Sequence, residues 1–293
     1  MTVLVTGRAY IGGLNNYGQV LLDRRETALW TPTIPNGTDG ALTAIPLPPN
    51  DIEGDALWLN DYGQVATSSY DVRNNVQYNH VSLWIPESKN GTAGSLSVIG
   101  HDGYDVEALN SYGQILGHVY PNHGFIWTPK HQNGAAGDLV KLTDGDTGWR
   151  GMDDSGLAIG TAFSTGLFNR KNEALIWLPQ ASNTSKGALL TLGALGDDAD
   201  SGATAISASG QVLGYSCTLE HYREEPYCKT TPHVFLWDRT HGMHDLLSLT
   251  DGWPGYELDE RVVAINSAGQ VVLAASDSAT GGHLLLLTPH PSA

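Results

Sequence analysis

The chain carries little charge, and positive charge is the scarcest. Only 16% of its 293 residues are charged, and 15 basic residues face 31 acidic ones, which gives a net charge of −16 at neutral pH. A nucleic-acid partner needs a clustered basic surface for its phosphates. This composition therefore disfavours such a partner, and no nucleic-acid partner is expected.

Long apolar runs are also missing. No stretch approaches the roughly 18 apolar residues of a membrane-spanning helix, so no membrane span is expected. The first ten residues, MTVLVTGRAY, lack the basic and long apolar regions of a signal peptide. As written, the sequence favours a cytoplasmic protein; a leader removed earlier would make it a secreted one. Oligomeric state is left open by the sequence.

Cysteine is nearly absent. Cys217 and Cys228 lie close together in one predicted connection. In an oxidising compartment they would close a loop as a disulfide. In a reducing compartment they would be two free thiols in a surface loop. Both alternatives remain.

Helix-forming residues are scarce as well, whereas residues that interrupt regular structure abound. The chain contains 35 glycines and 14 prolines against its small charged fraction. Such a composition is dense in turns and predicts an all-β protein.

One sequence pattern, a short turn, occurs six times along the chain. Each copy has a turn whose first residue is Asn, Asp or Ser, with a side chain that can bond the turn's own backbone. The fourth residue is always Gly, which permits the positive φ that such a turn requires. Successive glycines lie 43 to 59 residues apart, near the period of a four-stranded propeller blade. They are Gly18, Gly63, Gly113, Gly156, Gly210 and Gly269.

The third predicted strand of each copy ends in a large apolar residue. Proline follows two residues later in every copy but the fifth, and proline cannot continue a strand ladder. The apolar residues are Trp30, Trp84, Trp127, Trp177, Trp237 and Leu287. Fourth strands are predicted at Leu42–Leu47, Leu96–Ile99, Leu139–Leu142, Leu189–Leu192 and Leu246–Leu249.

The two ends of the chain predict how the array closes. The sixth copy has no room for a fourth strand, while Thr2–Thr6 forms an extra strand before the first turn. Pairing of these ends would remove the free sheet edges. We therefore predict a single all-β domain, a six-bladed β-propeller with four-stranded blades. Its blades are expected at 8–47, 48–100, 101–143, 144–195, 196–250 and 251–293, the last closed by residues 2–6. An open β-solenoid is the alternative and would need caps.

Two stretches carry a resemblance to a known repeat, Gly113-Gln114-Ile115-Leu116-Gly117 and His233-Val234-Phe235-Leu236-Trp237. The pattern N-x-x-G-Q-V-x-G followed by H-A-F-L-W-x-P is similar to the HAF repeat of bacterial, often exported, proteins. The similarity spans nearly the whole chain, but Leu157 replaces the usual Gln in the fourth copy. The resemblance implies a propeller-like fold and implies no activity or catalytic residue.

A histidine or glutamate recurs four residues before each of the large apolar residues. A metal ring is disfavoured, because side chains of different blades at this outer position cannot all reach one ion at about 2 Å. We interpret the position as a repeated hydrogen bond that ties each blade to a neighbouring loop. The residues are Glu26, His80, His123, Glu173, His233 and His283.

Acidic residues concentrate in the connections between blades, which gather at one mouth of a propeller channel. Converging carboxylates suit acid–base chemistry or a hard cation; solvated turns are the alternative. The candidate catalytic residues are His101, Asp102, Asp146, Asp198 and Glu257. No metal ligand is assigned. We expect no organic cofactor, and Ca²⁺ or another divalent cation on the channel or rim is the ion to consider.

Aromatic residues share these loops. They would line a pocket for an apolar or sugar ligand, or else plug the mouth of the channel. The candidate substrate-binding residues are Tyr104, Trp149, Arg150, Trp253 and Tyr256, with Arg150 facing an anionic group.

Divergent loops on a regular frame favour one asymmetric site over a repeated glycan reader. Motifs of serine hydrolases, zinc proteases, P-loop ATPases and dinucleotide-binding enzymes are missing. We therefore predict a small-molecule enzyme without organic cofactor, of the lyase, cyclase or isomerase type. The alternative is a non-catalytic ligand-, glycan- or protein-binding propeller module.

Overall fold

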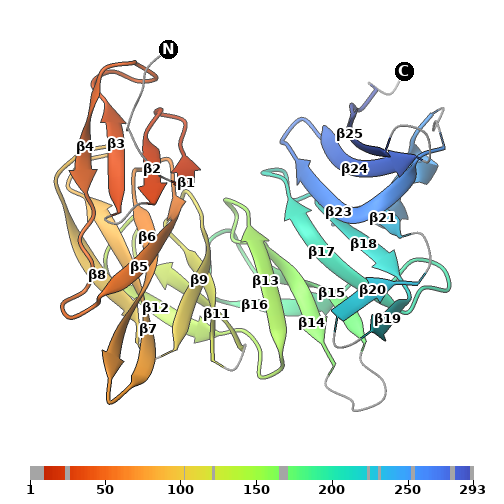
Figure 1. The fold of residues 1–293 in the computed structure, drawn as a ribbon, viewed down its shortest axis with the longest axis horizontal. Helices are drawn as coiled ribbons and strands as arrows, with labels where there is room; N and C mark the ends of the chain where they lie inside the picture. The colour runs from red at the N-terminus through yellow and green to blue at the C-terminus, as the bar shows by residue number, and fades with distance from the viewer. Residues whose placement is uncertain are drawn as a thin grey trace. The chain divides into compact units, whose positions relative to one another are not determined.

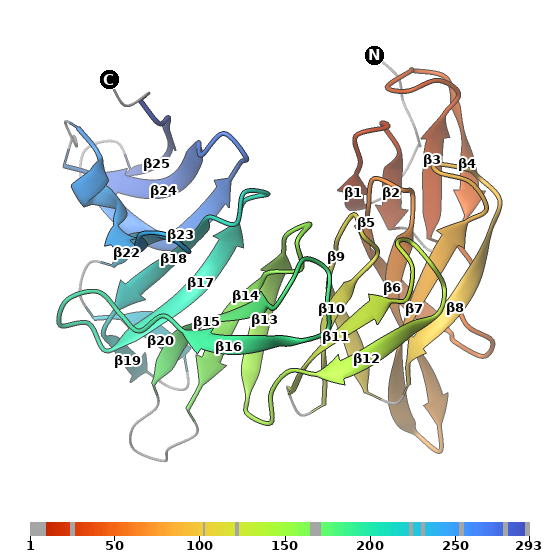
Figure 2. The ribbon, with the colours of Figure 1, turned by 180° about the vertical axis from the view of Figure 1, so that it is seen from behind.

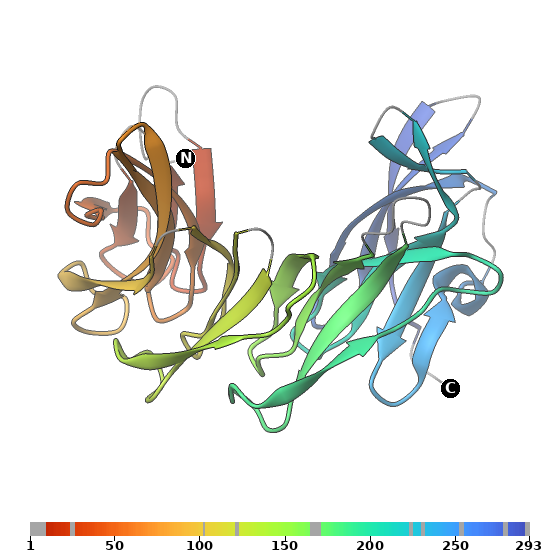
Figure 3. The same cartoon turned by 90° about the horizontal axis from the view of Figure 1, so that it is seen from below.

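The computed structural model describes residues 10–23, 27–101, 103–120, 123–164, 171–222, 225–229, 232–251, 255–277 and 281–290. The described part of the chain is all-β, with antiparallel sheets whose strands follow one another in chain order (Figures 1 and 3). Its one helical element is a single 3₁₀ turn. Among the described residues, no helix has the length and apolar character that a membrane crossing requires.

The chain divides into two compact units, and the first spans Met1–Leu142. It contains three four-stranded sheets, each a meander in chain order (Figure 2). The first sheet is β1 (Tyr10–Leu14), β2 (Val20–Asp23), β3 (Ala28–Pro32) and β4 (Gly40–Ala44). The second is β5 (Glu53–Leu59), β6 (Val65–Arg73), β7 (Val76–Pro86) and β8 (Gly94–Gly100). The third is β9 (Tyr104–Leu109), β10 (Ile115–Val119), β11 (His123–Pro129) and β12 (Gly137–Lys141).

The second unit spans Thr143–Ala293. Its fourth sheet is β13 (Thr147–Met152), β14 (Ala158–Phe163), β15 (Asn172–Pro179) and β16 (Gly187–Thr191). The fifth is β17 (Asp200–Ile206), β18 (Val212–Cys217), β21 (His233–Asp238) and β22 (Gly242–Asp245). The sixth has three described strands, β23 (Glu257–Ile265), β24 (Val271–Asp277) and β25 (Gly281–Leu287). The predicted strand Thr2–Thr6 lies outside the described residues.

The repeated turn forms as the sequence predicts. In the first sheet, Oδ1 of Asn15 accepts hydrogen bonds from the backbone N–H groups of Tyr17 (3.1 Å) and Gln19 (2.9 Å). The fourth residue of the turn adopts positive φ in all six copies, from 75° at Gly269 to 94° at Gly113. The predicted turn chemistry is therefore confirmed.

The hydrophobic core lies between neighbouring sheets within each unit. Leu21 and Leu29 of the first sheet pack with Val65 and Trp84 of the second. All five repeated tryptophans are buried, between 2% and 8% exposed. Strands β3, β7, β11 and β15 end at the proline that follows the tryptophan, as predicted.

Side-chain amides connect the turns of neighbouring sheets, and we call this set of hydrogen bonds the amide ladder. The Nδ2 of Asn15 donates to the carbonyl of Asn60 in the next sheet, and Asn60 donates to Asn110 in the same way, both at 3.0 Å. The Nε2 groups of Gln19 and Gln64 donate to the carbonyls of Asn90 (3.4 Å) and Asn133 (3.3 Å) of the following sheet. Because these side chains are buried, the ladder fixes the first sheet on the second and the second on the third.

One predicted strand is wrong. Residues Leu246–Leu249 form the 3₁₀ helix η1, and the fourth strand of this sheet is Gly242–Asp245. The Asp245 side chain accepts a hydrogen bond from the backbone N–H of Leu247 at 2.9 Å, which starts a helical turn. The turn buries Leu246 against the sixth sheet, so the apolar run satisfies the core without extending the ladder.

The connection that contains both cysteines is more ordered than the sequence indicated. Strands β19 (Leu219–Tyr222) and β20 (Glu225–Cys228) pair within it as a separate hairpin. Cys217 and Cys228 form a disulfide across its base, which decides between the two alternatives for the thiols.

Candidate functional site

The second sheet departs from the others by a long hairpin between its middle strands. Strands β6 and β7 stay paired from Val65 opposite Trp84 to Arg73 opposite Val76. Asn74 and Asn75 both adopt positive φ at its tip, as a two-residue hairpin turn requires. The extension places Asp71 and Arg73 beyond the region that the repeat shares.

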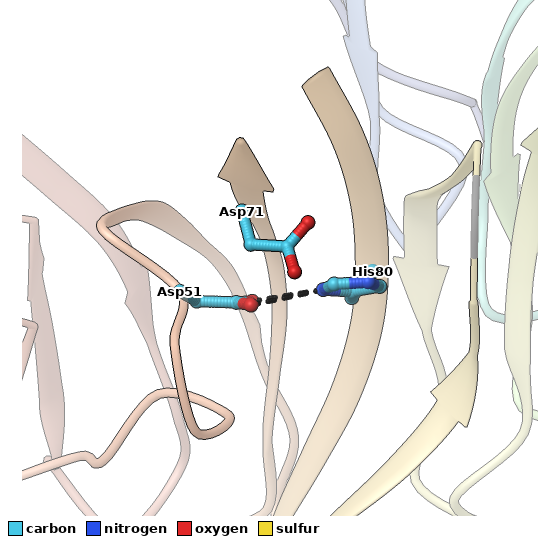
Figure 4. Close-up of side chains that lie close together, drawn as sticks. All are labelled: Asp51, Asp71 and His80. Carbon is cyan, nitrogen blue, oxygen red and sulfur yellow. Dashed lines mark hydrogen bonds and ion pairs between the residues drawn. The ribbon is translucent and has the colours of Figure 1, made fainter. Parts of the chain in front are cut away.

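At the base of this hairpin, a buried carboxylate holds a histidine. The Nδ1 of His80 lies 3.0 Å from Oδ1 and 3.1 Å from Oδ2 of Asp51 (Figure 4). The Asp51 side chain is fully buried and that of His80 is 8% exposed. The Ser69 hydroxyl donates to the same carboxylate. Asp51 comes from the connection before β5, so the pair ties that connection to the sheet.

Arg73 completes the network from the solvent side. Its Nε lies 2.9 Å and 3.0 Å from the two carboxylate oxygens of Asp71, and one terminal nitrogen lies 3.3 Å from Nε2 of His80. Arginine can only donate, so Nε2 of His80 accepts and the ring proton sits on Nδ1, facing Asp51. The guanidinium also lies 4.2 Å from the centre of the Tyr78 ring, while half of the side chain remains exposed.

His101, a predicted catalytic residue, lies beside this network. Its ring meets the ring of His80 edge to face, with 5.8 Å between centroids. The exposed His101 and the buried His80 therefore form a histidine pair at the end of the second sheet. We call Asp51, Asp71, Arg73, His80 and His101 the hairpin site.

The fifth sheet contains a reduced copy of this arrangement. There Nδ1 of His233 lies 3.0 Å from Asp198, and the Ser216 hydroxyl donates to the same carboxylate oxygen at 2.9 Å. The repeated hydrogen bond to a neighbouring loop is therefore confirmed at His80 and His233. It is not formed by Nδ1 of His123, which is buried without a hydrogen-bond partner among the described residues. Thr218 stands two residues after Ser216, where the second sheet has Asp71 after Ser69. The second carboxylate thus distinguishes the hairpin site from its copy.

Three side chains of the hairpin site lie close enough together to be tested as ligands of one metal ion. Asp51, Asp71 and His80 each offer one ligand atom, and these atoms lie within 4.8 Å of one another. Ligands of one ion at about 2 Å lie roughly 3 Å apart, which matches the separation of His80 and Asp51. Arg73 supplies the positive charge next to Asp71, so a cation would have to displace it.

The other predicted site residues are distributed over both units. Tyr104 packs edge to face on Phe125, with ring centroids 5.2 Å apart. Trp149 is 2% exposed, and its Nε1 has no hydrogen-bond partner among the described residues. Arg150 is exposed. Asp102 and Trp253 lie outside the described residues.

The described hydrogen bonds of the second unit do not join the remaining predicted acids to one another. Tyr256 packs on His283 with 4.9 Å between ring centroids, and the adjacent Glu257 is exposed. One oxygen of Asp146 is buried without a described partner. No described hydrogen bond joins Asp146 or Glu257 to Asp198, whose carboxylate is used by His233 and Ser216.

Sequence reasoning did not select Asp51, Asp71, Arg73 and His80 as a site. His80 was assigned a structural role because its position recurs in every copy. The signal that singles it out is the neighbouring Asp71-Val72-Arg73-Asn74-Asn75, an acid and a base just before a two-residue hairpin turn.

Comparison with protein-family models and with curated proteins finds no match for this chain. The resemblance to HAF repeats therefore stays a prediction, and the function must be argued from the residues.

Proposed function

We propose that the six sheets are the blades of one closed propeller. Apolar side chains on the outer sheets support closure. On β1, Tyr10, Ile11 and Leu14 are 65%, 75% and 70% exposed, and on β25 Leu284 and Leu286 are 73% and 61% exposed. Exposed apolar faces of this kind mark contact surfaces. Docking of the sixth sheet on the first would cover both faces.

The last turn provides a test of closure. In the described part of the chain, the Asn266 side chain is exposed and bonds only within its own turn. In a closed ring it would donate to the carbonyl of Asn15, as Asn60 does to Asn110. Asn266→Ala should then lower the free energy of unfolding by about as much as Asn60→Ala. A cost below about 1 kcal/mol would indicate an open array.

We further propose a small-molecule enzyme without organic cofactor, of the lyase, cyclase or isomerase type, that uses the hairpin site. The observation that carries the proposal is the buried Asp51 carboxylate on Nδ1 of His80, which leaves Nε2 as the basic nitrogen. A carboxylate that fixes a histidine tautomer in this way is how proteins prepare a general base.

The neighbouring groups fit an anionic substrate. Arg73 can swing from Nε2 to bind a carboxylate or another oxyanion, because half of its side chain is in solvent. His80 would then take a proton from the substrate through Nε2, while Nδ1–H stays on Asp51. His101 would return a proton to the leaving or rearranged group, so the proton count is unchanged.

A divalent cation is the second occupant to consider. Histidine in the ligand set favours a transition metal or Zn²⁺ over Ca²⁺, which prefers oxygen ligands. Removal of the competing guanidinium by Arg73→Met should therefore strengthen Zn²⁺ binding at this site, measured by titration calorimetry.

The enzyme hypothesis is tested with small carboxylic acids, whose consumption is followed by proton NMR. His80→Gln should abolish turnover of any acid that is consumed, and Arg73→Met should weaken binding of the acid. His233→Gln, which alters the reduced copy in the fifth sheet, is the matched control and should leave turnover intact. Turnover that survives His80→Gln, or binding without turnover in the unaltered protein, would favour the non-catalytic binding module.

A further inference from the structure

A groove of about 740 Å³ lies between the fourth and fifth sheets, at the end where the repeated turns lie. It is lined by Asp153, Ser155 and Leu157 of the fourth turn and by residues 209–211 of the fifth turn. Residues 179–182 and 238–241, which follow strand three of the two sheets, complete it. Its volume suits a small ligand, for which sites of about 300–1,000 Å³ are usual.

A shortened loop opens this groove. The connection between strands three and four covers residues 33–39, 87–93, 130–136 and 180–186 in the first four sheets. In the fifth sheet it covers only residues 239–241. In the second sheet the long connection carries Asn90, which receives hydrogen bonds from Asn15 and Gln19 of the preceding sheet. The fifth sheet has no such asparagine to fill this space.

The fourth turn also lacks the two amide side chains that donate across this junction in the first sheets. Leu157 stands where the first three turns have glutamine, and Asp153 stands where they have asparagine. Oδ1 of Asp153 accepts from the backbone N–H groups of Ser155 (2.8 Å) and Leu157 (2.9 Å) and from the Ser155 hydroxyl (2.7 Å). A carboxylate cannot donate to the next turn as Asn15 and Asn60 do. The amide ladder is therefore absent at this junction.

The lining is rich in groups that pair with hydroxyls. Ser155, Ser209 and Thr240 supply hydroxyls, and Gln180 and Gln211 supply amides. Burial raises the pKa of Asp238, but hydrogen bonds from His241 and from the Thr240 backbone together outweigh it, so the pKa of this carboxyl lies below its usual value. An ionised carboxylate accepts from neutral hydroxyls, and Leu157 gives an apolar floor.

We propose that this groove binds a neutral saccharide of one or two rings. Hydroxyls of the sugar would pair with the carboxylates, amides and serines, and a C–H face would cover Leu157. The site is independent of the hairpin site, which belongs to the other unit. Its ligand class follows from the lining, where neutral donors and acceptors outnumber charged groups.

The repeat itself offers variants that close the groove. The first three turns carry tyrosine (Tyr17, Tyr62, Tyr112) at the position of Ser155 and Ser209. Ser155→Tyr and Ser209→Tyr therefore introduce a residue that this turn already accepts. Ala268→Tyr makes the same change in the sixth turn, which does not line the groove, and serves as the matched control.

The probes are maltose, cellobiose, trehalose and sucrose, and binding is measured by saturation-transfer NMR and calorimetry. At least one probe should bind the unaltered protein, and each serine-to-tyrosine variant should weaken it tenfold or more while Ala268→Tyr changes nothing. Thermal unfolding checks that each variant is folded. Binding of none of the probes, or binding equally strong in all three variants, would overturn the proposal. Preference for an amine or a carboxylic acid over every sugar would overturn it as well.

Discussion

Asn60 at the centre of the amide ladder offers the strongest test of what holds neighbouring sheets together. The side chain is buried and makes four hydrogen bonds. Its Oδ1 accepts from the backbone N–H groups of Tyr62 (3.1 Å) and Gln64 (3.0 Å). Its Nδ2 donates to Gln64 Oε1 (2.8 Å) and to the carbonyl of Asn110 (3.0 Å). At about 1 kcal/mol for each hydrogen bond, Asn60→Ala should cost about 3–4 kcal/mol.

The matched control is the exposed Asn16, which follows Asn15, the residue of the first turn that corresponds to Asn60. Its Nδ2 donates to Asp61 Oδ2 at 2.6 Å. Because water can replace this contact, Asn16→Ala should cost less than about 1 kcal/mol. Urea unfolding, followed by tryptophan fluorescence, measures the free energy of unfolding of both variants, and the m-value should be the same in both. Equal costs for the two variants would refute the view that the buried amides, more than the exposed ones, join the sheets.

Three further predictions concern the repeat and its additions. Gly117→Ala should lower the free energy of unfolding by about 2 kcal/mol or more, because the added Cβ would lie 2.0 Å from the carbonyl oxygen of Asp105. Gly145→Ala is the control, because a Cβ there has no atom within 4 Å, and urea unfolding should show no change. The Cys217–Cys228 disulfide joins residues 11 apart, and its reduction should lower the free energy of unfolding by about 3 kcal/mol. Urea unfolding with and without reductant measures this difference, and equal free energies in the two conditions would contradict the prediction. The hydrogen bond that the protonated His118 ring donates to Glu107 raises the pKa of His118 above 6.5. The charges of Asp105 and Glu107 act in the same direction, and desolvation opposes them. The protonated His118 therefore stabilises the folded protein fully below pH about 6.5, and this contribution is lost as the pH rises through the folded pKa. The difference in free energy of unfolding between the unaltered protein and His118→Gln should accordingly shrink with rising pH, and a constant difference would contradict this.

Much of the fold could be predicted because its rules are local. The turn residues Asn15 and Gly18 determine their own hydrogen bonds and backbone angles, and the repeated tryptophans show which strand faces the core. The strand at Leu246–Leu249 was wrong because a competing local rule, the cap at Asp245, decides that segment. Apolar periodicity alone does not distinguish the two outcomes.

The candidate site was less accessible to sequence reasoning because it depends on contacts between distant segments. Asp51 and His80 are 29 residues apart, and only the register of β6 on β7 brings Asp71 and Arg73 beside them. His101 was selected for its loop, and its ring does lie next to His80. The groove between the fourth and fifth sheets depends on what a short loop leaves empty, and no single residue signals such a space.

The missing amide ladder between the fourth and fifth sheets also has a thermal consequence. At the turn end of that junction, Leu157, Val212 and Trp237 pack in one apolar cluster. The hydrogen bonds from the backbone N–H groups of Asn172 and Ala174 to Asp200 and Ser201 cross the junction at its other end. Apolar association weakens on cooling, whereas the hydrogen bonds between the first and second sheets do not depend on it. Near freezing, the turn ends of the fourth and fifth sheets should therefore loosen first, and amide protons in their facing turns should exchange with solvent while those of Gln19 and Gln64 remain protected.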